Sequence, residues 1–356
     1  MMAASSTSVD IKRTRSHSDA TSTGSHGRRR FPEKLVDKSR RVAPFGQADV
    51  DNGAAMTTGL ANVVSKKACQ LEMTLKNPRT GQISSPYWGQ AGLIQAERLT
   101  ASPPENPRKR QAQAGTDPER PSVEVASSLR SSRFEAIPIT CIHNVEDDVD
   151  DGVTWEFERS VLTAVAANAR YEVNFEKARY TPGTGESVVL RPSDANDEAI
   201  TWDYHDVTTA PKIDNAASPL TRKDLSFQKV VRDGFEFQVG QKIGMAVYRN
   251  FEVTPEDAGM SPNSVTADEL REIFGREGRV NIYTGQIMNV SPDNTAFEHN
   301  INSFRGCSGA VIFLLDVDQE GCGVVDNDYG KAIAVHVGGD RLSDGTIVNF
   351  AFKIHA

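Results

Sequence analysis

The chain has 356 residues, of which 38% are hydrophobic and 25% charged, so it is long enough for two domains and can build a globular core. Its formal net charge of −8 argues against nucleic acid as a required partner, and no stretch approaches the roughly 18 apolar residues that a membrane-spanning helix needs. The four cysteines match neither a zinc pattern nor a dense disulfide framework, so we expect free thiols and no bound metal or cofactor.

The first 56 residues are predicted to be a disordered basic tail. Ser, Thr and Gly are frequent there, and residues 1–50 carry ten Lys and Arg against five Asp and Glu. Such a tail is typical of an import signal or an interaction arm, although a merely solvated tail has the same composition. The N-terminus shows no apolar segment of the kind found in secretory signals.

Residues 57–222 are predicted to form a first β-domain, interrupted near 100–133 by a disordered loop rich in Pro, Arg, Gln and Ser. Short alternating segments separated by Gly, Asn and Asp indicate strands at 70–76, 91–97, 136–142, 170–176 and 187–192. The segment 158–169 fits either a short helix or a strand.

Residues 223–356 are predicted to form a second β-domain. Strands are expected at 235–240, 242–248, 280–287, 309–315, 331–337 and 346–352. One helix is expected at 266–274, because Thr266 and Glu269 have the spacing of a capping box and an apolar stripe follows. So many short strands suggest a sandwich or a barrel.

The segment "FRGCSGAVIF" (304–313) places Ser308 between two glycines, directly before an apolar strand. A tight turn of this kind lets backbone N–H groups point inward beside an exposed hydroxyl, as an acyl-transfer site requires. The same sequence also fits an ordinary hairpin turn. A nucleophilic serine needs a base, and His143 is a candidate because it follows an apolar strand and precedes an acidic turn.

Two segments resemble those of chymotrypsin-like serine peptidases. "ITCIHNVED" (139–147) is similar to the segment around the catalytic histidine of that family, and "RGCSGAVIF" (305–313) to its nucleophile segment. "AIAVHVGG" (332–339) resembles the strand that lines the specificity pocket. Among the branches of this family, the sequence most resembles the glutamyl endopeptidase (V8-like) branch, in which a histidine and two glycines follow the nucleophile.

The resemblance implies an all-β, double antiparallel β-barrel and a serine endopeptidase that acts through an acyl-enzyme on a protein or peptide. His143 would be the base and Ser308 the nucleophile, in the family's order of His, Asp and Ser. The third member would be Asp206, with Asp203 as the alternative. The backbone N–H groups of Gly306 and Ser308 would bind the oxyanion. His336 and Gly338 would bind substrate, with His336 projecting toward a glutamate before the scissile bond.

Two departures from the family pattern bear on how the protein works. Cys307 stands where pancreatic-type members have an aspartate, which makes activation by insertion of a new N-terminus improbable on chemical grounds. Asn144 replaces a frequent cysteine, so that disulfide is absent. Both fit an intracellular enzyme, cytoplasmic or nuclear, better than a digestive one. The oligomeric state is left open.

A competing alignment leads to an inactive protein. "SVLTAVAANA" (160–169) also resembles the family's histidine segment, with Ala166 in place of the base. In that register the chain would be an inactive pseudopeptidase of the same fold, acting as a protein-binding module.

Overall fold

The computed structural model describes residues 64–97, 134–144, 148–150, 153–164, 169–173, 179–180, 188–193, 199–202, 206–209, 229–231, 234–315, 329–341 and 347–354. The predicted basic tail and the predicted loop near 100–133 lie outside these residues, as do Ala166, Asp203 and Cys322. The domain boundary near residue 222 stays a prediction.

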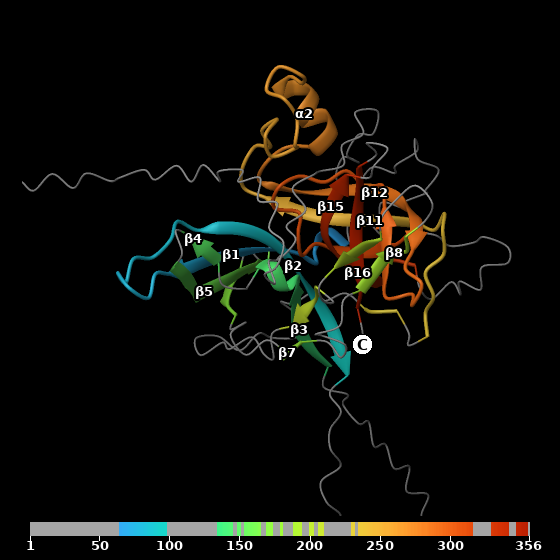
Figure 1. The fold of residues 1–356 in the computed structure, drawn as a ribbon, viewed down its shortest axis with the longest axis horizontal. Helices are drawn as coiled ribbons and strands as arrows, with labels where there is room; N and C mark the ends of the chain where they lie inside the picture. The colour runs from blue at the N-terminus through green and yellow to red at the C-terminus, as the bar shows by residue number, and fades with distance from the viewer. Residues whose placement is uncertain are drawn as a thin grey trace, which may run out of the picture. The chain divides into compact units, whose positions relative to one another are not determined.

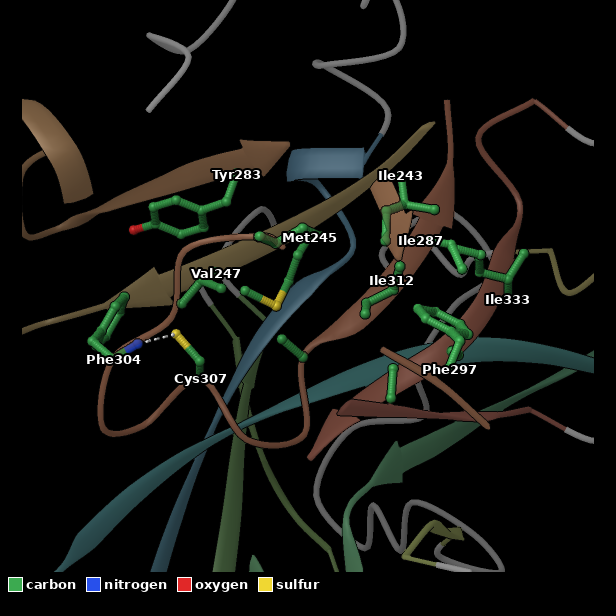
Figure 2. Packing of buried hydrophobic residues seen from close by; sticks show 14 of the residues in the cluster. Ile243, Met245, Val247, Tyr283, Ile287, Phe297, Phe304, Cys307, Ile312 and Ile333 are labelled. Atoms are coloured by element: carbon green, nitrogen blue, oxygen red, sulfur yellow. Dashed lines mark hydrogen bonds between the residues drawn. The ribbon is translucent and has the colours of Figure 1, made fainter. Parts of the chain in front are cut away.

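The C-terminal half forms a closed antiparallel barrel of six strands, in the order β11-β12-β13-β16-β15-β14. Figure 1 draws these strands in yellow, orange and red. Their bounds are β11 (Lys242–Arg249), β12 (Arg279–Val290), β13 (Ala296–His299), β14 (Val311–Leu314), β15 (Ala332–Arg341) and β16 (Ile347–Lys353). Alternate residues of β11, namely Ile243, Met245 and Val247, are fully buried. They fill the barrel because successive side chains of a strand point to opposite faces (Figure 2).

The N-terminal half forms an antiparallel sheet in the order β4-β5-β1-β2-β3-β10-β7, with β6 paired to β5. The strands are β1 (Ala68–Lys76), β2 (Tyr87–Glu97), β3 (Phe134–Thr140), β4 (Asp148–Asp150), β5 (Val153–Ala164), β6 (Ala169–Glu172), β7 (Arg179–Tyr180) and β10 (Thr208–Thr209). Over the described residues this path does not close, so the sheet is a half-barrel. Strands β8 (Val188–Arg191) and β9 (Ile200–Trp202) form a separate pair.

The all-β class and the barrel predicted from the sequence are confirmed, whereas the first sheet is more open than the predicted double barrel. The expected helix is α2 (Ala267–Phe274). Both bonds of its capping box are present, from the Glu269 N–H to Thr266 Oγ1 and from the Thr266 N–H to Glu269 Oε2. The ambiguous segment 158–169 lies largely in β5 and is a strand.

The predicted strand at 235–240 is wrong. Phe235 and Phe237 are buried in the barrel core, which explains the alternating pattern. The segment nevertheless joins no ladder, because the Phe237 N–H donates to the Asn294 side chain, 2.9 Å away. Alternation reports burial on one face and does not require pairing with another strand.

The half-barrel and the barrel share a hydrophobic cluster. Ile94 of β2 and Ile139 of β3 pack in one cluster with Val311, Val335 and Phe350 of the barrel. The segment that follows β3 is therefore held beside the turn that precedes β14. These are the segments that carry His143 and Ser308.

Candidate active site

Three segments that are far apart in the sequence supply the predicted triad. His143 lies in the 3-10 turn Ile142–Asn144, directly after β3. Asp206 comes just before β10, which pairs with the end of β3 through Thr208 and Thr140. That pairing places the aspartate next to the histidine turn.

Asp206 contacts His143 through both of its carboxylate oxygens. Oδ2 lies 2.5 Å from His143 Nδ1, and Oδ1 accepts a hydrogen bond of 3.1 Å from the His143 backbone N–H. The Asp206 side chain is completely buried, whereas that of His143 is 28% exposed. A carboxylate at Nδ1 favours the tautomer in which Nδ1 carries the proton and Nε2 can accept one. The sequence left Asp206 and Asp203 as alternatives, and the structure brings Asp206 to the histidine.

Ser308 lies in the turn 305–309, which we call the nucleophile turn after its predicted role. Two groups of the half-barrel and of the segment after β3 bind the Ser308 carbonyl. The Ser308 carbonyl accepts hydrogen bonds of 2.8 Å from the Gln90 backbone N–H and from Asn144 Nδ2. Its hydroxyl donates to the Val337 carbonyl at 3.0 Å. Because Asn144 is the neighbour of His143, this carbonyl ties the nucleophile turn directly to the histidine turn.

The glycine after Ser308 is required by close packing. A Cβ at Gly309 would lie 2.0 Å from the Gln90 carbonyl oxygen and 2.4 Å from Thr140 Oγ1, and the φ angle of this residue is +91°. Contacts below 3 Å with backbone cannot be relieved cheaply, and positive φ strains any residue with a Cβ. This is the physical reason for the second glycine of Gly-Cys-Ser-Gly.

The base and the nucleophile are not hydrogen-bonded to each other in the part of the chain that the structure describes. His143 Nε2 lies 3.4 Å from the sulfur of Cys141, a fully buried thiol. Burial is the main cause that raises the pKa of Cys141, so the thiol is protonated and can donate to Nε2. For the predicted role of His143 as a base, Nε2 has to exchange this partner for Ser308 Oγ. Loose contacts of this kind are frequent in active sites without substrate.

The turn before Ser308 exposes two backbone N–H groups. The Cys307 N–H donates to the Phe304 carbonyl at 3.1 Å, and Gly306 has φ +101°, as the third residue of a type II turn does. The Gly309 N–H donates to the His336 carbonyl. Within the described residues the N–H groups of Gly306 and Ser308 donate to no protein acceptor, which matches the two predicted oxyanion donors.

Cys307 points away from this site. Its side chain is completely buried in the barrel core, and its sulfur accepts a 3.5 Å hydrogen bond from the Phe304 backbone N–H. Figure 2 shows this contact beside Tyr283 and Val247. Of the two adjacent nucleophilic residues, only Ser308 is partly exposed.

The sequence predicts that His336 projects toward the substrate, and the structure shows its side chain covered by other residues. His336 lies on β15 and is fully buried, and its Nδ1 is 3.1 Å from Nε2 of His299, which is also fully buried. The ladder between β15 and β16 has an irregularity directly after His336, between His336 and Gly338. Gly338, the other predicted substrate residue, lies on β15 and pairs with Phe350 on β16.

We expect His299 to make the free energy of unfolding fall as the pH decreases from about 6.5 toward 3. Burial lowers the pKa of His299 to about 3 in the folded state, whereas an unfolded histidine takes up a proton near pH 6.5. His299 therefore leaves the free energy of unfolding unchanged above pH 6.5. Between pH 6.5 and 3 that free energy falls by about 1.4 kcal/mol for each unit of decreasing pH. Urea unfolding of the wild type and of His299→Gln between pH 7 and pH 4 measures this difference. Parallel stability curves would contradict the assignment.

Three residues at the site were not singled out as functional from the sequence: Gln90, Thr140 and Asn144. All three are buried and polar, and each hydrogen-bonds to the nucleophile turn or to a residue that holds it. Asn144 was noted only as a missing cysteine. Its amide occupies the space beside Gly89, where a Cβ would come within 2.6 Å of Nδ2. No local pattern distinguishes such residues from surface Gln, Thr and Asn.

A surface pocket of about 490 Å³ lies elsewhere, against β1 and β5. Its three carboxylates belong to Glu72, Glu158 and Glu172. Each is paired with a cation, namely Arg170, Lys76 and Arg159 in that order. Because each carboxylate is paired with a cation, nothing in this pocket points to a catalytic or binding site.

The described residues contain no group of His, Cys, Asp and Glu that could hold a metal ion. Among the described helices, none has the length and apolar character needed to cross a membrane.

Comparison with known proteins gives a likeness in fold. No family model and no curated protein matches the chain. Among solved structures, the chain is similar to Rv3671c from M. tuberculosis H37Rv, in an inactive form with a serine replaced by alanine. The identity is 11%, the match covers 88% of this chain and 90% of that one, and the TM-score is 0.35. It is also similar to the protease Anisep from Arthrobacter nicotinovorans, at 10% identity over 81% of this chain and 90% of that one, with a TM-score of 0.39. At such identities, the roles of the site residues rest on their own geometry.

Proposed function

We propose that the chain is a serine endopeptidase that hydrolyses peptide bonds of protein or peptide substrates without a cofactor. Ser308 is the nucleophile, His143 the general base and acid, and Asp206 the residue that orients His143. The observation that carries the proposal is the double contact of the buried Asp206 carboxylate with the ring and the backbone of His143. A buried carboxylate that fixes a partly exposed imidazole beside a serine is the arrangement that general-base catalysis needs.

The reaction follows from these positions. Nε2 of His143 takes the proton of Ser308 Oγ while this oxygen attacks the substrate carbonyl carbon. The negative charge on the carbonyl oxygen is stabilised by the N–H groups of Gly306 and Ser308. His143 then gives the proton to the leaving amine, and an acyl-enzyme remains. A water molecule, deprotonated in turn by His143, hydrolyses the acyl-enzyme and restores Ser308.

Two resting contacts must break before this sequence starts. Ser308 Oγ leaves the Val337 carbonyl, and His143 Nε2 leaves the Cys141 thiol. A hydrogen bond contributes only about 0.5–1.5 kcal/mol net, and a thiol is a weak donor. This cost is small beside the 8 kcal/mol or more by which enzymes typically lower a barrier.

The second candidate is an inactive pseudopeptidase that binds proteins. It is favoured by the same two contacts, because in a dead site they would persist and Nε2 would never meet Ser308. The competing alignment, with Ala166 in place of the base, leads to the same candidate, and Ala166 lies outside the described residues.

A serine-directed fluorophosphonate probe separates the two candidates. An active enzyme forms a covalent adduct with the probe, and we expect mass spectrometry to locate it on Ser308. Protein unfolded in denaturant is the control, because an ordinary serine hydroxyl does not react. Cleavage of a peptide library tests turnover. Absence of both labelling and cleavage in the folded protein would reject the endopeptidase and leave the binding module.

Substrate preference is the finer part of the proposal. The V8-like branch implies glutamate before the scissile bond, and His336 is adjacent to Val337, whose carbonyl contacts Ser308 Oγ. Because His336 is fully buried, substrate contacts it only if the residues that cover it move. A library profile without enrichment of glutamate would reject this part alone. An intracellular location, cytoplasmic or nuclear, is also part of the proposal, and the free, buried thiols of Cys69, Cys141 and Cys307 support it.

A further inference from the structure

Gln90 is a buried polar residue with an unusually complete set of partners. It lies on β2 and is 2% exposed. Its side-chain Nε2 donates to the carbonyls of Tyr248, at 2.9 Å, and of Gly306, at 3.2 Å, while its Oε1 accepts from the Tyr248 N–H at 3.1 Å. Since backbone carbonyls only accept and N–H groups only donate, these three partners fix which end of the amide is nitrogen.

The main chain of Gln90 also contacts the site. Its N–H donates to the Ser308 carbonyl at 2.8 Å, and its carbonyl accepts from Thr140 Oγ1 at 2.8 Å. One residue of the half-barrel thus bonds to two carbonyls of the nucleophile turn, those of Gly306 and Ser308. The Ser308 contact comes from the backbone N–H and needs no particular side chain, whereas the Gly306 contact depends on the glutamine side chain.

The Gly306 carbonyl belongs to the peptide group between Gly306 and Cys307. This group separates the two peptide groups whose N–H bonds, of Gly306 and of Ser308, are the oxyanion donors. Gly306 has φ +101° and no Cβ, so its own sterics restrict this peptide group little. The Cys307 N–H holds one edge of the group through the Phe304 carbonyl, and the Gln90 bond to the Gly306 carbonyl holds the other edge, so that both donors stay aimed at one point.

We propose that Gln90 is a positioning residue that holds the oxyanion turn through the Gly306 carbonyl. This inference rests on the endopeptidase proposed above, and it adds a residue that neither contacts the substrate nor belongs to the triad. The bonds to Tyr248 anchor the amide on β11, so that the Gly306 bond is made from a rigid strand rather than from a mobile side chain. Electrostatic stabilisation depends on such preorganisation, because donors that must reorient during the reaction lose most of their effect.

The chain offers a matched control for this role. Gln70 lies on β1 directly opposite Gln90 in the sheet register and is 3% exposed. Its Nε2 donates across to the barrel as well, to Asn250 Oδ1 at 3.0 Å. Gln70 is therefore a second buried glutamine that joins the half-barrel to the barrel, but its bond does not involve the nucleophile turn.

Gln90→Met and Gln70→Met are the two variants to compare, since methionine keeps the length of the side chain and removes the amide. Gln90→Met removes three hydrogen bonds to backbone groups, and Gln70→Met removes the bond to the exposed Asn250, so both should lower the thermal unfolding temperature, Gln90→Met the more. Only Gln90→Met should lower kcat, by about 10- to 100-fold, with KM nearly unchanged. This is less than the roughly 10²- to 10³-fold loss for removing an oxyanion donor itself, because the donors remain and only their alignment is lost. A peptide trifluoromethyl ketone, whose tetrahedral adduct places an oxyanion at the donors, should bind Gln90→Met more weakly by the same factor.

The outcomes separate this inference from the proposed function. If the wild type is active and both variants lose kcat equally, or if Gln90→Met changes KM alone, Gln90 is merely structural and the inference fails by itself. If the wild type neither cleaves peptides nor reacts with the fluorophosphonate probe, the proposed function fails first and takes the inference with it. Should Gln90→Met not fold, Gln90→Asn keeps an amide that is one methylene too short to reach both Tyr248 and Gly306. It should show the same selective loss of kcat.

Discussion

Ser308→Ala should abolish peptide cleavage, with a fall in kcat of about 10⁶-fold, and should end labelling by a fluorophosphonate probe. The hydroxyl is the only atom that can form the acyl-enzyme in this turn, because the neighbouring thiol of Cys307 is buried in the barrel core. Binding and the oxyanion donors remain, so a residual rate above the uncatalysed reaction should persist. The measurement is steady-state cleavage of a peptide substrate at protein concentrations confirmed by folded-state spectroscopy.

The fold should tolerate this change. Ser308 is partly exposed, its hydroxyl makes one hydrogen bond, to the Val337 carbonyl, and its own carbonyl keeps both donors. The unfolding temperature should therefore stay within a few degrees of the wild type. Ser264→Ala, which removes an exposed hydroxyl in the loop before α2, is the matched control and should keep full activity. Cleavage by Ser308→Ala at the wild-type rate would show that the nucleophile is a different residue.

Asp206→Asn should lower kcat by about 10⁴-fold and change KM little. The carboxylate now accepts from two donors, the His143 backbone N–H and Nδ1. An amide has a single acceptor, so its NH₂ group must face one of them. If the amide oxygen stays on the backbone N–H, the NH₂ faces Nδ1 and drives the imidazole proton to Nε2. Nε2 can then no longer accept the proton of Ser308.

Two measurements distinguish this effect from general damage. Asp293→Asn changes a carboxylate that also accepts a backbone N–H, that of Thr295, but in the turn between β12 and β13. It should leave kcat unchanged. Fluorophosphonate labelling of Asp206→Asn should slow in parallel with kcat, since both depend on the same proton transfer. A variant that unfolds at the wild-type temperature and keeps the wild-type kcat would remove Asp206 from the mechanism.

The sequence was sufficient to locate most strands, and the segments that carry the proposed triad residues lie where the predicted strands end or begin. Ser308 and His143 lie in segments whose sequences resemble those of chymotrypsin-like peptidases. The strands around them follow from alternating apolar residues and from turn residues. Asp206 was only one of two candidates, because a short β10 interrupted by irregular chain carries little periodicity. The contact with His143 depends on the pairing of β10 with β3, which no local pattern reveals.

Burial was the property that the sequence could not supply. The sequence around His336 is the same whether its side chain meets substrate or is buried, and only the packing around β15 decides between the two. The residues next to Gln90 in the sequence likewise do not reveal which groups its side chain contacts. Its role arises from three backbone partners located 158 and 216 positions away in the chain.

The two donors on the Ser308 carbonyl, from Gln90 and Asn144, have a consequence for the autonomy of the halves of the chain. The barrel closes on itself, yet the turn that bears its nucleophile is anchored by amides that belong to the other sheet. A fragment that contained only the barrel would keep the hydroxyl and both glycines but would lose the supports that set their direction. The proposed reactivity is thus a property of both sheets packed together, and neither half of the chain should show it alone.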